Sequence, residues 1–379
     1  MIGHSKISFA FATSIGTAIG VGLFALPYLA SQTSFATLLA YFIVLGILIT
    51  IIQLIYGEII TKTEQRHQLS GYAKIHLGPH WQPWVFVVEF LGIIGALTAY
   101  LVVGGKFLYL LSSPLIGGGV TLYVLIYFSL GTLLVYWGIQ SVAGSELVLV
   151  GLLIGTIIFL FLANYTRLDF QLLTNISAKN LFLPYGAVLF ALWNGTVIPE
   201  VAEVLDKNHR QLKKIIILST LLSIILYIIF VITVFGLSGD HTSSDALTGL
   251  AQYFSPTLLT VALVLGLLAT FTSFISLAMA AKNSLTEDWR LKPRLAWFGV
   301  CFLPLALYFL GAQNFLTIIS LTGAIMFGAY GFLILLIYLK IKNRPTGDYH
   351  LNLPKTLVYF LGIVLALGVI GEIFYTLTR

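Results

Sequence analysis

The chain has 379 residues, of which 59% are hydrophobic and only 9% are charged, with a formal net charge of +6 at neutral pH. Because a soluble domain carries about 25% charged residues, this composition excludes a soluble globular protein and indicates an integral membrane protein. The basic balance does not indicate a nucleic-acid partner, because the positive charge lies in loops between hydrophobic segments, and the single cysteine, Cys301, excludes an intrachain disulfide.

Eleven hydrophobic segments are long enough to cross a bilayer, which takes ~20 apolar residues in a helix. Each is too long and too continuous for a strand of a membrane barrel. The sequence therefore predicts an all-α polytopic membrane protein in which residues 1–379 form one transmembrane transporter domain. The predicted spans cover residues 7–30, 35–61, 84–112, 119–137, 145–163, 182–205, 213–238, 256–281, 294–311, 314–341 and 356–377.

The distribution of positive charge predicts the orientation. Most of the 20 lysine and arginine residues lie in the N-terminal tail or in the loops that follow every second span. Such residues accumulate on the cytoplasmic side of a membrane. We therefore expect a multi-pass protein of the cell (inner or plasma) membrane, with a cytoplasmic N-terminus and an extracellular or periplasmic C-terminus.

The first span contains three glycines, Gly16, Gly20 and Gly22, followed by Pro27. Glycine costs a helix about 1 kcal/mol relative to alanine and lets the backbone leave helical geometry. In hydrocarbon, non-helical backbone is tolerated only where protein or a watery cavity receives it. We expect the helix to be interrupted near residues 17–21. The competing interpretation is close helix packing, because Gly16 and Gly20 stand four residues apart.

The sixth span has the same character. Trp193-Asn194-Gly195-Thr196 and then Pro199-Glu200 interrupt it near its middle. Two interrupted spans at corresponding positions of two halves are the best sequence indication of a transporter's binding site. Their separation by five spans predicts two inverted repeats, residues 7–163 and 182–341, with an extra helix at 356–377.

The motif Gly16-Thr-Ala-Ile-Gly-Val-Gly-Leu-Phe, with Ala-Leu-Pro27 after it, resembles the first-helix signature of the amino acid–polyamine–organocation superfamily. The most similar branches are the amino acid/auxin permeases and the bacterial tryptophan/tyrosine permeases. Thr98-Ala-Tyr100-Leu-Val-Val-Gly-Gly in the third span is similar to the same branches, as is Pro199-Glu200 with Leu212-Lys-Lys-Ile-Ile. The resemblance implies the LeuT-like fold and secondary transport of amino acids.

An interrupted helix presents free amides as an anion site. The resemblance implies that a substrate carboxylate binds the first-span amides, while carbonyls of both breaks face its ammonium group. Trp193 is interpreted either as part of the side-chain pocket or as core packing, and Tyr100 either as a ligand or as a tyrosine satisfied by a neighbouring helix. The predicted substrate residues are Thr17, Ala18, Gly20, Val21, Gly22, Tyr100, Ala191, Trp193 and Asn194.

Thr272 and Ser273 in the eighth span place two hydroxyls side by side, and hard cations prefer such oxygen ligands. The alternative is that these hydroxyls bond their own helix or a neighbour. The resemblance implies a sodium site, and the matching positions are Gly16, Ile19, Ala269, Thr272 and Ser273.

Ionisable residues within spans are functional candidates by default. Glu200, in the sixth span, is a candidate gate or proton-linked group. Glu89, Lys106 and Glu203 lie in or near spans and receive no assigned role.

No nucleophile, metal-enzyme, P-loop or dinucleotide motif is recognisable, so we expect neither an enzyme nor ATP-driven transport, and no cofactor apart from Na⁺ as the coupling ion. The expected function is sodium-coupled symport of a neutral amino acid, with aromatic and large aliphatic side chains as candidates. Proton-coupled symport or exchange is the first alternative, and a non-transporting amino acid sensor is the second. The expected partners are the amino acid, Na⁺ or H⁺ and the lipid bilayer, without nucleic acid or an obligatory protein partner. The amino acid, the coupling stoichiometry and the oligomeric state are left open.

Overall fold

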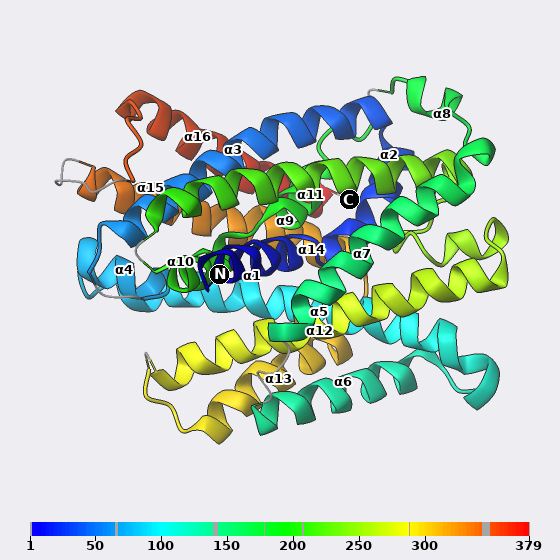
Figure 1. Ribbon diagram of the computed structural model, residues 1–379, viewed down its shortest axis with the longest axis horizontal. Coiled ribbons are helices and arrows are strands. Elements are labelled where there is room, and N and C mark those ends of the chain that lie inside the picture. The colour runs from blue at the N-terminus through cyan, green and yellow to red at the C-terminus, as the bar shows by residue number, and fades with distance from the viewer. Residues whose placement is uncertain are drawn as a thin grey trace.

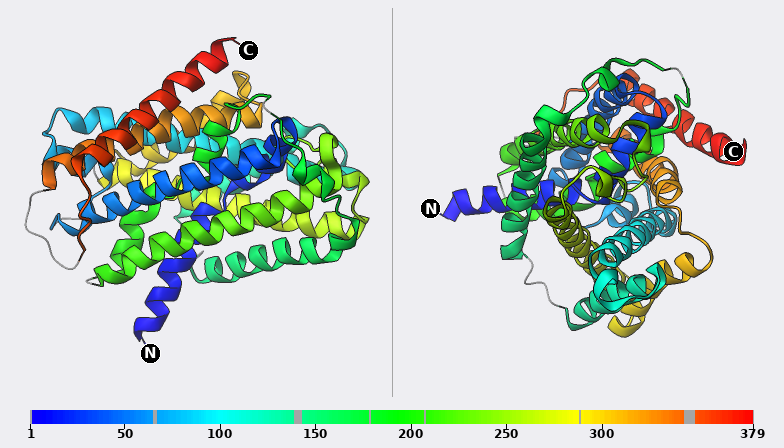
Figure 2. Two further views of the ribbon diagram at one scale, coloured as in Figure 1. Left: turned by 90° about the horizontal axis from the view of Figure 1, so that it is seen from above. Right: turned by 90° about the vertical axis from the view of Figure 1, so that its right-hand side faces the viewer.

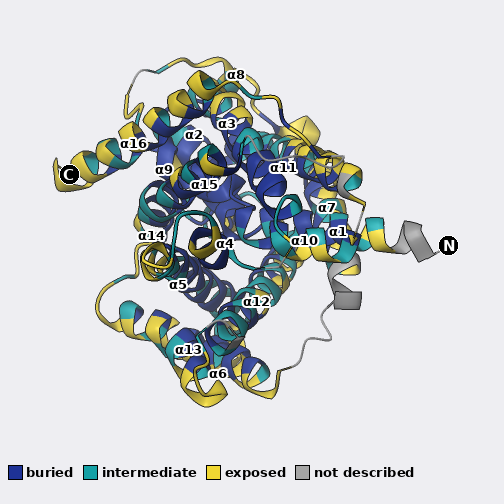
Figure 3. Ribbon diagram, turned by 90° about the vertical axis from the view of Figure 1, so that its left-hand side faces the viewer, coloured by how far each residue is buried: buried dark blue, intermediate teal, exposed yellow. Residues whose placement is uncertain are grey.

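The computed structural model describes residues 2–64, 67–138, 143–177, 179–206, 208–287, 289–342 and 349–378. Every regular element within these residues is helical. Figure 1 shows long helices lying side by side along the longest axis of the molecule. Buried residues gather on the central helices and exposed residues on the outer ones (Figure 3), as expected of a helical bundle with an apolar perimeter facing lipid.

The helices follow the predicted spans closely. Within the described residues, ten segments are long and apolar enough to cross a membrane. The remaining predicted span, at 294–311, corresponds to a shorter apolar helix of 17 residues. The helices that match a predicted span without a break are, in chain order, α3 (Phe35–Thr61), α5 (Trp81–Ile116), α6 (Val120–Trp137), α7 (Ala143–Asn164), α11 (His209–Ser238), α12 (Pro256–Glu287), α13 (Pro293–Phe309) and α16 (Lys355–Thr378).

The first crossing is broken, as predicted. It consists of α1 (Ile2–Ala18), a 3₁₀ turn η1 (Val21–Ala25) and α2 (Leu26–Gln32). At the break Gly20 is extended, with φ −96° and ψ −157°. The N-terminal end of α1 projects away from the bundle in both views of Figure 2.

The sixth crossing is broken at its middle. It consists of α9 (Pro184–Leu192), a 3₁₀ turn η3 (Gly195–Val197) and α10 (Ile198–Leu205). Trp193 is extended, with φ −75° and ψ 117°. Pro199 lies in the first turn of α10, where its missing N–H costs nothing, so it begins the second half-helix rather than obstructing one.

The tenth crossing contains a feature that the sequence did not predict. Between α14 (Phe315–Leu321) and α15 (Gly328–Ile341), residues 322–327 form a π-helical turn, η6 (Thr322–Phe327). The turn packs against α9 so closely that a Cβ added to Gly323 would lie 2.0 Å from the Gly186 carbonyl oxygen. Such turns are frequent at functional sites, and this one carries Phe327 to the first pocket described below.

We call the end of the bundle that carries residues 67–81, 289–293 and 349–355 the basic end. There α4 (Leu69–His76) packs beneath the bundle against α5 and α15, with Tyr72 buried. A short strap, residues 349–353, also lies across this end.

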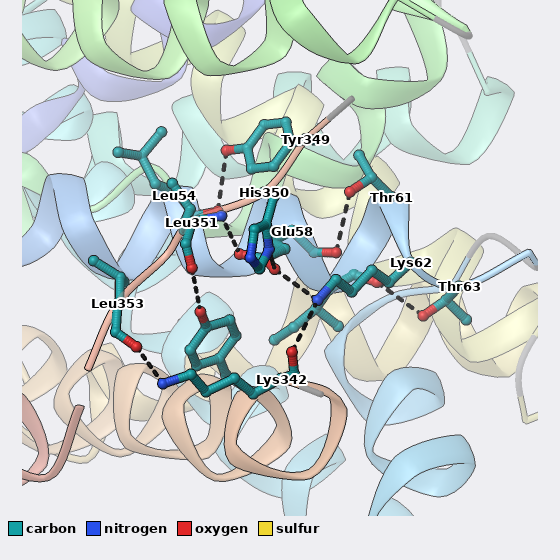
Figure 4. Close-up of polar contacts among 12 residues, drawn as sticks. Leu54, Glu58, Thr61, Lys62, Thr63, Lys342, Tyr349, His350, Leu351 and Leu353 are labelled. Carbon is teal, nitrogen blue, oxygen red and sulfur yellow. Dashed lines mark hydrogen bonds and ion pairs between the residues drawn. The ribbon is translucent and has the colours of Figure 1, made fainter. Parts of the chain in front are cut away.

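The strap is fastened to a buried carboxylate. Glu58 on α3 is fully buried and accepts hydrogen bonds from His350 Nδ1 (3.0 Å) and the Leu351 amide (3.0 Å), while Lys62 Nζ lies 2.7 Å away (Figure 4). Tyr349 donates to the Leu54 carbonyl. Burial, together with the nearby charge of Glu58, raises the pKa of Tyr349, so its hydroxyl keeps the proton that this bond needs.

Glu58→Ala should destabilise the protein by about 3 kcal/mol, because it leaves the nearly buried Lys62 ammonium without its carboxylate and frees the strap. The measurement is the unfolding temperature of the detergent-solubilised protein. Glu64→Ala, which removes an exposed carboxylate at the same end, is the control. Equal unfolding temperatures for Glu58→Ala and the unchanged protein would contradict this account.

Candidate substrate and ion site

A small pocket lies between the two broken crossings. Seven of the nine predicted substrate residues line it. The full lining is Thr17, Ala18, Gly20, Gly22, Ile93, Ala96, Tyr100, Phe190, Ala191, Trp193, Thr196, Leu277 and Phe327.

The other two predicted residues, Val21 and Asn194, are not part of this lining. The Val21 side chain is buried in the core. Asn194 Nδ2 donates to Ser14 Oγ (2.7 Å), and Ser14 donates to Ser219 Oγ on α11 (2.9 Å). Asn194 therefore joins the two broken crossings to each other and to α11.

The first-span amides already have acceptors nearby. The Gly20 amide donates to the Ala18 carbonyl (2.9 Å). The Tyr100 hydroxyl lies beside the Val21 amide and the Ser273 hydroxyl. Tyr100 thus places an oxygen where the exposed amides favour an anionic group.

At two positions, close contacts leave room for no residue larger than glycine. A Cβ added to Gly20 would lie 2.4 Å from the Tyr100 hydroxyl oxygen, and one added to Gly22 would lie 2.8 Å from Ala191 Cα. Real Cβ atoms do not approach so closely. Gly20 therefore admits Tyr100 from α5, and Gly22 lets the two broken crossings touch.

Aromatic rings form one wall of the pocket. Phe327 stacks on Phe190, with centroids 5.6 Å apart, and on Trp193, with centroids 5.3 Å apart. The buried indole N–H of Trp193 has no hydrogen-bond partner among the described residues. The sequence did not indicate Phe327, because only the π-helical turn brings it here.

A larger cavity adjoins the pocket and reaches the basic end at Gln68 and Ser284. Glu89, which is buried, and Glu200, which is exposed, both line it. Glu203 does not line it, although it is exposed on the same helix as Glu200. All five predicted sodium residues line this cavity: Gly16, Ile19, Ala269, Thr272 and Ser273.

The donor set around Thr272 suits a hard cation. The Thr272 hydroxyl donates to the Leu268 carbonyl of its own helix (3.0 Å), as the alternative interpretation expected. A hydroxyl has one proton and two acceptor lone pairs, so this bond leaves its oxygen able to bind a cation. Tyr100 lines both cavities and touches Ser273, and it therefore connects the two predicted sites.

The side opposite the basic end is closed above the pocket. Phe24 packs edge-on against Phe107 and Phe230, with centroids 4.9 and 6.0 Å apart. Beyond these rings, Lys106 forms an ion pair with Asp245. Asp245 is buried and also accepts bonds from Thr248, so the segment between α11 and α12 is fastened to α5.

Comparison with known proteins adds family evidence to this geometry. The model of the tryptophan/tyrosine permease family matches residues 5–374. "Glutamine transporter 2" of Aliivibrio fischeri (strain ATCC 700601 / ES114) is 24% identical over 358 residues, which are 89% of this chain and 90% of that protein.

Two solved structures show the same fold. MhsT in complex with L-phenylalanine superposes with a TM-score of 0.70 at 14% identity, covering 97% of this chain and 98% of that one. The manganese transporter of Eremococcus coleocola gives 0.69 at 13% identity, covering 97% and 87%. At such identities the likeness concerns the fold alone, which is the predicted LeuT-like arrangement of helices.

Gly20→Ala should destabilise the protein by about 1–3 kcal/mol, because the new methyl group collides with the Tyr100 hydroxyl. Tyr100→Phe removes that oxygen and leaves the nearest ring carbon 3.4 Å away. The double variant should therefore recover much of the lost unfolding temperature. Gly155→Ala is the control, because an added Cβ there meets nothing within 4 Å. Additive losses in the double variant would refute the contact.

Proposed function

The chain belongs to the tryptophan/tyrosine permease family and is an amino acid transporter, and from this premise we propose that it carries neutral amino acids in symport with sodium by alternating access. Family membership also removes the non-transporting sensor as an alternative. The observation that carries the proposal is the pocket between the two helix breaks, which opens onto a second cluster of oxygen ligands.

In the proposed complex, the substrate carboxylate takes the place of the Ala18 carbonyl at the Gly20 amide and of the Tyr100 oxygen at the Val21 amide. The Gly22 amide and the Tyr100 hydroxyl are its further donors. The carbonyls of Ala18 and Ala191 lie at the breaks to receive the ammonium group. None of the residues that line the small pocket is charged, and this favours a neutral side chain.

The side chain of the substrate would lie against Phe190, Trp193 and Phe327. The buried Trp193 N–H supports side chains that also carry an acceptor, because a buried donor without a partner costs about 1–3 kcal/mol. The side-chain amide of L-glutamine provides such an acceptor, and the Aliivibrio fischeri relative is named as a glutamine transporter. The aromatic wall also suits aromatic amino acids.

The proposed sodium site uses the carbonyls of Gly16, Ile19 and Ala269 with the hydroxyls of Thr272 and Ser273. Sodium bound there would fix the first crossing and Ser273, which is a neighbour of Tyr100. Each ligand would then favour the other's binding, and this reciprocity is what coupling requires.

The cavity that reaches the basic end, and the ring cluster that closes the other end, support an inward-facing state with a cytoplasmic N-terminus. In the proposed cycle, spans 1, 2, 6 and 7 rock against spans 3–5 and 8–10, as in an inverted-repeat transporter. Opening the other side would separate Phe24 from Phe107 and release Lys106 from Asp245.

Proton coupling is the second candidate, and Glu89 and Glu200 support it because both carboxylates line the cavity. Glu200 lies in the first turn of α10 and lines the cavity. Protonation of either carboxylate from the cavity would then replace sodium binding as the coupled event.

Purified protein in liposomes should accumulate one or more of the twenty amino acids when an inward sodium gradient is applied, with L-glutamine, L-tryptophan and L-phenylalanine tested first. A potassium gradient of equal size is the control for ionic strength. Equal uptake in both would remove sodium coupling, and acceleration by a proton gradient alone would establish the second candidate.

Thr272→Val should raise the sodium concentration for half-maximal uptake at least tenfold, because it replaces a ligand oxygen with a methyl group of similar size. Thr260→Val on the same helix is the matched control, since the Thr260 hydroxyl is exposed and bonds only its own turn in the described contacts. The site is misassigned if both variants keep the sodium dependence of the unchanged protein.

A further inference from the structure

One tyrosine from a third helix contacts both breaks at once. Tyr227 on α11 is fully buried, and its hydroxyl donates to the Ala18 carbonyl and to the Ala191 carbonyl (2.7 Å). Ala18 is the last residue of α1, and Ala191 lies in the last turn of α9. Both carbonyls therefore belong to helix ends that lack the next turn's amide.

A single hydroxyl proton must serve both oxygens. The Ala18 carbonyl also accepts from the Gly20 amide (2.9 Å), so a lone pair there becomes free for the ammonium group when the substrate carboxylate takes that amide, whereas the Ala191 carbonyl has the tyrosine as its donor. Because both oxygens lie within hydrogen-bonding distance of one atom, they are near enough to contact one small cationic group together.

A second contact from α11 lies two turns away. Ser219 accepts from Ser14 of the first crossing, and Ser14 accepts from Asn194 of the sixth. With a rise of ~1.5 Å per residue, the eight residues between Ser219 and Tyr227 span about 12 Å. The helix α11 thus contacts α1 at two levels before its break, and it is tied to the sixth crossing through Ala191 and, by way of Ser14, through Asn194.

We propose that the Tyr227 hydroxyl is the positioning group that sets the spacing of the two breaks and holds the Ala18 and Ala191 carbonyls ready for the ammonium group of the substrate. The inference rests on the proposed function only in taking the breaks as the substrate site. The tie itself is a property of the ligand-free protein, and it makes α11 move with both broken crossings.

The test that needs no substrate is amide hydrogen exchange of Tyr227→Phe in detergent, read by mass spectrometry. Exchange should rise about tenfold in the peptides that cover residues 15–22 and 190–196, because each break loses a buried hydrogen bond. Tyr123→Phe is the matched control, since this buried tyrosine donates to the Gly117 carbonyl far along the chain from both breaks. Unchanged exchange at either break, or a rise spread over all helices, would overturn the proposal.

Ser219→Ala provides a milder variant if Tyr227→Phe does not fold. It removes the second tie and should raise exchange in the same two peptides by a smaller factor, two- to fivefold. An increase confined to α11 itself would overturn the two-point attachment.

The functional readout compares an amino acid with the α-hydroxy acid of the same side chain. The amino acid is the one that gives the largest thermal stabilisation among the twenty. Tyr227→Phe should weaken its binding about tenfold and leave the weaker hydroxy acid within twofold. Equal losses for both would overturn the role toward ammonium. If no amino acid stabilises the unchanged protein, the proposed function fails while the exchange result still decides the tie.

Discussion

The structure depends on one constraint, which is that main-chain groups set free inside a membrane must find partners within the protein. Breaking two crossings frees carbonyls and amides at mid-depth. Side chains from unbroken helices supply the partners: Tyr227 for Ala18 and Ala191, and Gln53 for the Leu192 carbonyl (3.3 Å). The freed carbonyls are therefore satisfied by two unbroken helices, α11 and α3, rather than by solvent.

This constraint also explains why the two proposed sites are neighbours. Residues of the first break line both cavities: Ala18, Gly20 and Gly22 line the small pocket, and Gly16 and Ile19 line the larger cavity. Tyr100 reaches the break only because residue 20 has no side chain, and from there its hydroxyl touches Ser273. A change of backbone at Gly20 is thereby transmitted to both cavities.

The fold leaves the cargo open. MhsT was solved with L-phenylalanine, whereas another protein of the same fold is a manganese transporter. What distinguishes such proteins is the set of side chains around the breaks. Here that set is uncharged and rich in aromatic rings at the small pocket, and the charged groups Glu89 and Glu200 lie farther along the cavity.

The sequence alone determined the spans, their order and the positions of both breaks, because these depend on local composition: runs of apolar residues interrupted by glycine and proline. These signals and the family resemblance together predicted Thr17, Gly20, Tyr100 and Trp193 for one site, and the structure brings all four to one pocket. Asn194 was placed at the correct break, but its side chain turned to Ser14 instead of the pocket.

Only the tertiary structure revealed Tyr227, Phe327 and the strap on Glu58. Tyr227 meets a carbonyl 209 residues away, and the Glu58 carboxylate meets the Leu351 amide 293 residues away. Phe327 reaches its place through a π-helical turn that the continuous apolar pattern of its span does not reveal. Local composition determines where the chain crosses the membrane and where a helix breaks. The hydrogen-bond partner of each main-chain group freed at a break depends on how helices distant in sequence pack together.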